Sequence, residues 1–514
     1  MSDAASAFDT SAMPDDPATL KVLLAAERKL RVELSDEVTR LEAIVAAFKR
    51  ALFGRRSEKL DGDQPELALE ETEQGFGEQR ATADAGDTSL KTARTARRRG
   101  NRGHLPAHLP RIEVVVEPES LACACCDGAL HAIGEDVSER LDVIPAQFRV
   151  IVTRRPKYAC RRCAEGIVQA PAPERLIAGG LPTEAMVAHV IVSKYADHLP
   201  LYRQAQIYAR QGLALDRSTL ADWVGHAAHE LRPLHDRLVE ILTASAKLFA
   251  DETRAPVLDP GRGRTKTGWL WTVARDDRPW GSADPPAVVY LYAEGRGAEH
   301  ATRYLGGFLG VLQVDGYSAY GRLNGATLAY CWAHCRRKFY EIAEAGHAPI
   351  AEEALRRIGQ LYAVEAEING LDPEQRRAVR QERARPVVEE FFPWLEKQLR
   401  HLAGKSRLAQ AIRYALKHRD GLRRYLDDGR IEIDSNVVER AIRPVALNRK
   451  NALFAGSDTG AEHWAILASL IETAKLNAVN PHDYLADILE RIVAGHRQSR
   501  IDELLPWNYP KAQV

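Results

Sequence analysis

The chain has 514 residues, 45% of them apolar, and 71 acidic residues balance 71 basic ones. This length exceeds what a single hydrophobic core usually supports, so we expect several domains. No run of about 18 apolar residues occurs, which argues against a membrane span. The N-terminus lacks the basic and then apolar pattern of a signal peptide, so the expected location is the cytoplasm.

A heptad pattern runs from Leu20 to Ala51 within a first domain, residues 1–60. Its two seams hold Leu20, Leu34, Leu41 and Phe48, and Leu23, Leu30, Ile44 and Ala51. Eight apolar residues in these positions predict a coiled coil or helical hairpin, and we favour self-association of the chain. The alternative is one amphipathic helix that packs on the rest of the protein.

Residues 61–111 read as a linker whose charge changes sign along its length. Residues 61–88 contain nine acidic residues and one basic one, whereas residues 89–111 contain seven basic residues and no acidic one. The basic arm contains Lys91, Arg94, Arg97, Arg98, Arg99 and Arg102. Such an arm suits contact with DNA phosphates, and the alternative is a solvated tail.

A zinc ribbon is predicted in residues 112–175. Four of the seven cysteines form two CxxC pairs, Cys123 with Cys126 and Cys160 with Cys163. Four thiolates at this spacing bind one structural Zn²⁺ ion, and we expect short strands between the pairs, such as Phe148–Thr153. Cys125 could replace Cys123 as a ligand, but the CxxC spacing favours Cys123.

Residues 176–243 read as a helical region with a helix-turn-helix pattern. A first helix ends near Gly212, which suits a turn, and Asp216 or Ser218 can cap the second. Arg217 and Thr219 then begin a helix that could enter the major groove of DNA. A plain helical pair in a protein core has the same pattern, so both interpretations stay open.

From Ala246 the pattern changes to strands. The expected elements are short strands at 248–250, 268–274 and 287–292, a helix near 297–306, a strand that ends at Asp315 and a strand at 327–332. This is the order of a ribonuclease H-like fold, in which the first and fourth strands are neighbours. We therefore predict a multidomain α/β protein whose catalytic core is residues 244–480.

Two helical segments complete the expected architecture. An all-helical insertion occupies about residues 340–430 of the core, where Asp372-Pro373 is a good helix start. Residues 481–514 form a C-terminal helix and tail.

Three acids are the candidate catalytic residues. Asp251 and Asp315 end two apolar runs, and Glu439 lies in the helical pattern that starts at Asn436. Acids at neighbouring strand ends, joined by one from a helix, can clamp two Mg²⁺ ions for phosphodiester chemistry. Glu252 competes with Asp251, but adjacent strand residues face opposite sides, and Asp434 reads better as a turn or cap residue.

Basic residues surround the third acid. The candidate DNA contacts here are Arg440, Arg443, Arg449 and Lys450, and a second group, Arg336, Arg337 and Lys338, follows the fifth strand. The alternative is an exposed helix face with ordinary salt bridges. Cys331 and His334 could be metal ligands or pocket residues, although such a pair more often simply packs.

At this point the chain resembles the IS66-type insertion-sequence transposases over nearly all of its length. The matching motifs are Leu52–Lys59, Glu135–Glu139 with Arg155–Tyr158, Val314–Tyr317, Cys331–His334 with Arg336–Phe339, Asn436–Pro444 and Ser469–Asn477. The first cysteine pair departs from the family pattern, because Ala124 and Cys125 replace its usual Pro-x-Cys-Gly sequence. This departure leaves the choice between Cys123 and Cys125 open.

The resemblance implies a DDE transposase that binds terminal inverted repeats, cleaves the element ends and transfers the 3′-OH to target DNA. It implies Asp251, Asp315 and Glu439 as catalytic acids with two Mg²⁺ or Mn²⁺ ions, in a bacterial, nucleoid-associated protein. Small accessory proteins of the same element are possible partners. A DNA-binding regulator, or a nuclease or resolvase with the same core, is the competing interpretation.

Overall fold

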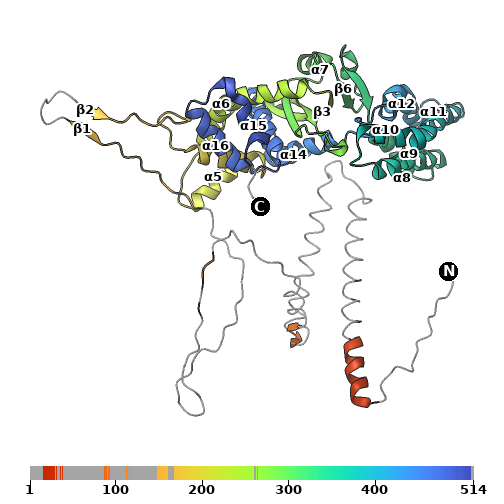
Figure 1. Ribbon diagram of the computed structural model, residues 1–514, viewed down its shortest axis with the longest axis horizontal. Helices are drawn as coiled ribbons and strands as arrows, with labels where there is room; N and C mark the ends of the chain where they lie inside the picture. Colours follow the sequence, from red (N-terminus) through yellow and green to blue (C-terminus); the bar gives the residue numbers. More distant parts are fainter. Residues whose placement is uncertain are drawn as a thin grey trace. The chain divides into compact units, whose positions relative to one another are not determined.

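A computed structural model describes residues 16–28, 147–159, 167–259 and 264–510, together with isolated positions elsewhere. The chain divides into two units, residues 1–153 and 154–514. In the first unit, residues 17–28 form a helix (Figure 1), and its apolar side chains, such as Leu23, are exposed. This agrees with a helical start to the heptad pattern, whose remainder lies mostly outside the described residues.

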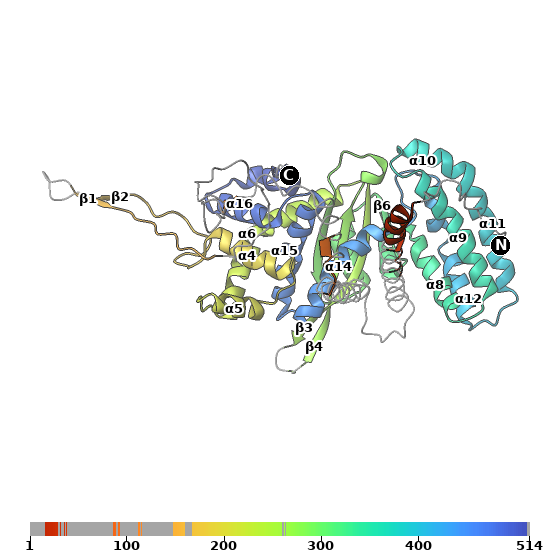
Figure 2. The ribbon, with the colours of Figure 1, turned by 90° about the horizontal axis from the view of Figure 1, so that it is seen from below.

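A five-stranded mixed sheet is the centre of the second unit (Figure 2). Its strands are β3 (Lys247–Asp259), β4 (Arg264–Arg275), β5 (Ala287–Ala293), β6 (Val311–Val314) and β7 (Thr327–Tyr330). Their order is β5-β4-β3-β6-β7, antiparallel from β5 to β3 and parallel from β3 to β7. The first and fourth strands in chain order, β3 and β6, are therefore neighbours, as predicted from the sequence.

The expected length of the first strand was wrong. β3 spans 13 residues, so Asp251 lies inside the strand instead of at its end. The polar stretch that follows Asp251 stays extended because β4 pairs with β3 up to the hairpin, where Asp259 lies opposite Arg264. Pairing with a neighbour, rather than apolar character, sets where this strand ends.

Helices protect the free edge of β5. The backbone N–H groups of Val288 and Tyr290 donate to the hydroxyls of Thr473 and Ser469 on α15 (Asp458–Leu476), at 3.1 and 2.8 Å. The ring of His235, on α6 (Arg217–Thr243), lies 3.1 Å from the carbonyl oxygen of Tyr290. These contacts satisfy edge groups that would otherwise be open to another strand.

The expected helical pair is present. α5 (Leu201–Arg210) leads through Gly212, at φ +81°, into α6, and α4 (Glu184–Tyr195) precedes them. The first turn of α6 is mostly exposed; further along, one face of the helix buries Trp223 and other apolar residues in the core that α6 shares with the sheet. The second helix is therefore mainly a core helix, as in the plain structural alternative. Asp216 occupies its N-cap position, without a side-chain hydrogen bond.

The C-terminal part is helical as expected. α16 (Pro481–Val493) packs against α4 and is followed by two short 3-10 turns. The expected helix after the third strand is α7 (Ala298–Leu305). No helix in the described part of the chain is long and apolar enough to cross a membrane.

The region expected to be an all-helical insertion is helical, and its first helix begins earlier than predicted. Its helices are α8 (Trp332–Glu344), α9 (Pro349–Glu367), α10 (Pro373–Val379), α11 (Arg385–Leu399), α12 (Arg407–Lys417) and α13 (Arg419–Arg423). The helices enclose their own core, which includes Trp332 and Phe391. Asp372 caps α10 by accepting the N–H of Gln375 at 2.9 Å, as its sequence indicated.

The region of the predicted zinc ribbon is described only in part. β1 (Lys157–Ala159) and β2 (Ile167–Gln169) form a small antiparallel pair on either side of the second CxxC. Residues 148–153 are not in a strand, so the strand expected there was wrong. The four predicted zinc ligands, Cys123, Cys126, Cys160 and Cys163, lie outside the described residues. Three arginines of the basic arm, Arg97, Arg98 and Arg99, also lie outside them.

Candidate functional site

Asp251 on β3 and Asp315, the residue directly after β6, correspond to each other in the register of these two neighbouring parallel strands. The pairing of β3 with β6 joins Lys247 to Val311 and Phe249 to Gln313, an offset of 64 positions, and the same offset separates Asp251 from Asp315. Residues in register on adjacent strands point to the same face of a sheet. The two carboxylates therefore share one face.

The surroundings of Asp251 disfavour its negative charge. The pKa of Asp251 is raised to about 7, first by burial and then by the carboxylates of Glu252, Asp315 and Glu439, against a backbone hydrogen bond from Glu252 that lowers it. That N–H donates to Oδ1 of Asp251 at 2.8 Å. A bound cation stabilises the charged form of a carboxylate that lies among other carboxylates. The surroundings of Asp251 are therefore the part of the site that fits Mg²⁺.

Asp315 is fixed by the turn that follows β6. Its Oδ1 accepts the N–H of Tyr317 at 2.7 Å, and its carbonyl oxygen accepts the hydroxyl of Tyr414 from α12. Gly316 has φ +97°, and a Cβ there would lie 3.1 Å from Nε2 of His418. The backbone conformation therefore favours glycine after Asp315, and the neighbouring His418 leaves little room for a side chain.

Both carboxylate oxygens of Glu252 accept hydrogen bonds from other side chains. Its Oε1 accepts Nε of Arg296 and its Oε2 accepts the hydroxyl of Tyr320, both at 2.6 Å. The Arg296 guanidinium lies 3.8 Å from the ring centre of Tyr317 and 5.0 Å from that of Trp269. These contacts hold the buried carboxylate of Glu252 in an ion pair with the partly exposed Arg296, which favours Asp251 as the metal-facing member of the two. No sequence pattern indicated Arg296 or Tyr320 as its partners.

The segment before α14 (Asn436–Ala452) carries Glu439 to the sheet. Nε2 of Gln313 on β6 donates to the carbonyl of Glu432, and its Oε1 accepts the N–H of Glu432, both at 2.9 Å. The N–H of Trp332 donates to the carbonyl of Ile433 at 3.0 Å. These bonds anchor the chain after the insertion to the end of β6.

Glu439 then lies in the first turn of α14, on the helix that the sequence predicted. Its Oε1 is 3.6 Å from Nδ1 of His334, and its Oε2 is 3.6 Å from Nη2 of Arg337. Asp434 acts as a turn residue, as expected, because it accepts the backbone N–H of Asn436 at 3.1 Å. Glu439 therefore sits beside α8 while its charge still reaches Asp251.

Cys331 and His334 belong to this site, a role that the sequence interpretation ranked below simple packing. Cys331 is indeed buried, but its Sγ, a ring nitrogen of His334 and a carboxylate oxygen of Glu439 all lie within 4.8 Å of one another. In the described part of the chain this is the one group of three potential metal ligands gathered so closely. The spacing of Cys331 and His334 was the sequence signal for it.

The basic residues proposed to contact DNA have different environments. Arg336, Arg337 and Lys338 on α8 are exposed, as are Arg440, Arg443 and Lys450 on α14 and Arg217 on α6, whereas Thr219 is half-buried. Arg449 donates instead to the side chain of Thr253 and the carbonyl of Arg254, so it joins α14 to β3. These hydrogen bonds give Arg449 a structural role, and its assignment as a DNA contact is therefore weaker.

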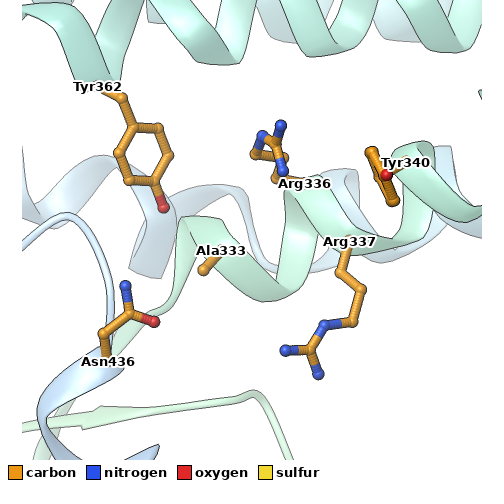
Figure 3. A pocket seen from close by; sticks show the side chains of 6 residues that line it. All are labelled: Ala333, Arg336, Arg337, Tyr340, Tyr362 and Asn436. Atoms are coloured by element: carbon orange, nitrogen blue, oxygen red, sulfur yellow. The ribbon is translucent and has the colours of Figure 1, made fainter. Parts of the chain in front are cut away.

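A cavity of about 390 Å³ opens beside the cationic face of α8 (Figure 3). It is lined by Ala333, Arg336, Arg337, Tyr340, Tyr362 and Asn436. Figure 3 shows the hydroxyl of Tyr362, from α9, pointing toward the first turn of α8 and toward Asn436. Guanidinium groups, aromatic rings and an amide are the groups that bind a nucleic-acid backbone and its unpaired bases.

Four segments of the chain match known family descriptions. Residues 179–463 match "Transposase IS66 family", 120–164 match "zinc-finger binding domain of transposase IS66", 469–507 match "IS66 C-terminal element" and 40–114 match "Transposase C of IS166 homeodomain". The second match indicates a structural zinc site in the predicted ribbon.

Relatives in Sinorhizobium fredii cover almost the whole chain. The uncharacterized protein y4jD is 47% identical over 94% of this chain and 97% of its own length. The uncharacterized protein y4qI is 46% identical over 97% of this chain and 98% of its own length, and y4hP is 38% identical over 93% and 90%.

Proposed function

The chain belongs to the IS66 family of transposases, and we propose that it works by a DDE mechanism in a ribonuclease H-like core. In this proposal it binds the terminal inverted repeats of its element, cleaves the element ends and joins the exposed 3′-OH to target DNA. The strand order β5-β4-β3-β6-β7, with only the last three strands parallel, supports this type of core.

The observation that supports the proposal is the register of β3 and β6, which relates Asp251 to Asp315, together with the effect of the Glu439 charge on Asp251. This arrangement suits two Mg²⁺ or Mn²⁺ ions held by Asp251, Asp315 and Glu439. When bound, such ions activate the attacking oxygen and neutralise the leaving one. The chain itself contributes the fixed carboxylates and, through Arg296 and Tyr320, removes Glu252 from competition for the metal.

Exposed cations next to the acids support DNA as the substrate. Arg336, Arg337 and Lys338 on α8 and Arg440, Arg443 and Lys450 on α14 can hold phosphates near the carboxylates. We assign Arg97, Arg98 and Arg99, and the exposed Arg217 with Thr219, to further DNA contacts. Self-association through the N-terminal heptads and help from accessory proteins belong to the same proposal.

The decisive assay uses purified protein, Mg²⁺ and a labelled element end, scored separately for binding, nicking and joining. We expect Asp251→Asn and Asp315→Asn to reduce nicking to roughly 1% of wild type or less, with binding preserved. Asp222→Asn, an exposed aspartate on α6, is the matched control and should keep full activity.

Each competing function predicts a different result in this assay. Nicking without joining would identify a nuclease or resolvase. Binding without any metal-dependent cleavage, unchanged by both substitutions, would identify a DNA-binding regulator and overturn the proposal.

A further inference from the structure

We propose that Cys331, His334 and Glu439 form a second type of metal site, which takes a borderline divalent cation such as Zn²⁺. Their potential ligand atoms, one sulfur, one nitrogen and one oxygen, lie within 4.8 Å of one another. This set differs from the all-oxygen set that Mg²⁺ prefers. Three protein ligands with a further open position are typical of catalytic rather than structural zinc sites.

The distance between His334 and Glu439 favours a shared ion over a direct bond. Nδ1 of His334 and Oε1 of Glu439 are both buried, neither has a hydrogen-bond partner, and they lie 3.6 Å apart. This separation is too long for a good hydrogen bond. Two ligands of one tetrahedral zinc ion are separated by roughly 3.3–3.8 Å, given metal–ligand bonds of about 2.0–2.3 Å. A cation between them would satisfy both buried atoms.

The backbone around Cys331 fixes the position of its sulfur atom. It occupies the N-cap position of α8, it is 1% exposed, and its Sγ accepts the backbone N–H of Ser435 at 3.2 Å. A backbone donor to the ligand atom fixes its orientation. Ser435 precedes α14, so the same contact that fixes the sulfur brings Glu439 close to it.

The proposed site has a consequence for the catalytic centre. Glu439 would bind the proposed ion through Oε1, which leaves Oε2, beside Arg337, for the catalytic ions that it shares with Asp251 and Asp315. The two metal positions would then differ in chemical preference. This consequence rests on the proposed transposase function, whereas binding of the ion by the three residues does not.

Cobalt(II) provides the test, because a thiolate bound to Co²⁺ gives a near-ultraviolet charge-transfer absorption that oxygen ligands do not. The full-length protein, freed of metal and kept reduced, is titrated with Co²⁺ without DNA. We expect Cys331→Ser to lose part of the thiolate absorption and one bound equivalent of Co²⁺, since the predicted ribbon supplies the rest. Cys335→Ala is the matched control, a buried cysteine one turn further along α8, and should match wild type.

Equal absorption and equal stoichiometry in wild type and Cys331→Ser would overturn the site. If Cys331→Ser does not fold, His334→Gln decides in its place, with a changed absorption spectrum and weaker Co²⁺ binding expected. Unchanged binding by that variant would likewise reject the proposal. Since no DNA is present, the result is independent of the cleavage assay, and either proposal can fail alone.

Discussion

Gln313 of β6 and Glu432, which precedes α14, exchange two hydrogen bonds of 2.9 Å across 119 positions of sequence. Gln313 is buried, with 1% of its surface exposed. Its side-chain amide donates to the backbone carbonyl of Glu432 and accepts its N–H, as the backbone of a neighbouring strand would. These bonds return the chain from the helical region to the end of β6, next to Asp315. Glu439 reaches the site because of this anchor.

Replacing Gln313 by leucine should therefore impair both folding and function. The backbone N–H and carbonyl of Glu432 would lose their partner, and we expect a loss of about 2–4 kcal/mol in the free energy of unfolding by urea. End cleavage should fall more than DNA binding, because Glu439 loses its support. Gln375→Leu, at an exposed position of α10, serves as the control; equal stability of both variants would contradict the anchor.

A buried arginine should stabilise the insertion. Arg380 is fully buried, pairs with Glu365 at 2.6 Å and donates to the carbonyls of Tyr425 and Ile431. Arg380→Ala leaves Glu365 without its main partner, and we expect a loss of about 3–5 kcal/mol in unfolding experiments.

The neighbouring Arg383 offers a matched comparison. It pairs with Glu367 at the surface, where both side chains are about half exposed, so Arg383→Ala should have little effect on stability. Similar losses in the free energy of unfolding for Arg380→Ala and Arg383→Ala would show that burial does not determine how much the Arg380–Glu365 pair stabilises the protein.

His418 should make the stability depend on pH. Burial lowers the pKa of His418 to about 4, and the charge of Lys417 adds to this effect. The unfolded chain has an ordinary histidine pKa of about 6.5, so it binds more protons than the folded chain between these values. The contribution of His418 is therefore fully present above pH 6.5 and is lost as the pH falls toward 4.

His418→Gln should flatten this part of the curve. Between pH 6.5 and 5 we expect the variant to lose about 1–2 kcal/mol less than wild type in chemical unfolding. His482→Gln, at a half-exposed histidine in the first turn of α16, is the control. Parallel curves for wild type and His418→Gln would contradict the prediction.

The cationic face of α8 should contribute to DNA affinity through phosphates. Arg336 is exposed and lines the cavity of Figure 3. Arg336→Ala should weaken binding of unrelated DNA sequences alike and reduce the slope of log K against log salt by about 1. Arg400→Ala, an exposed arginine at the end of α11, should leave the slope unchanged, and an unchanged slope for Arg336→Ala would remove this residue from the interface.

Much of the architecture could be read from local patterns. The order of the strands, α7 after the third strand, the cap at Asp372 and the turn at Gly212 follow from apolar periodicity and from residues with special backbone preferences. These features depend on neighbours within a few residues, so the sequence alone predicts them. The length of β3 was missed because its polar half is extended only through pairing with β4.

The chemistry of the site shows the same division. The sequence by itself determined which acids, cysteines and histidines are available, and the Cys331–His334 spacing marked a possible metal pair. Only the tertiary structure decided that Arg296 engages Glu252, that Arg449 joins α14 to β3 and that His334 faces Glu439. These partners lie far apart in the chain, and the packing of helices on the sheet, which no local pattern encodes, brings them together.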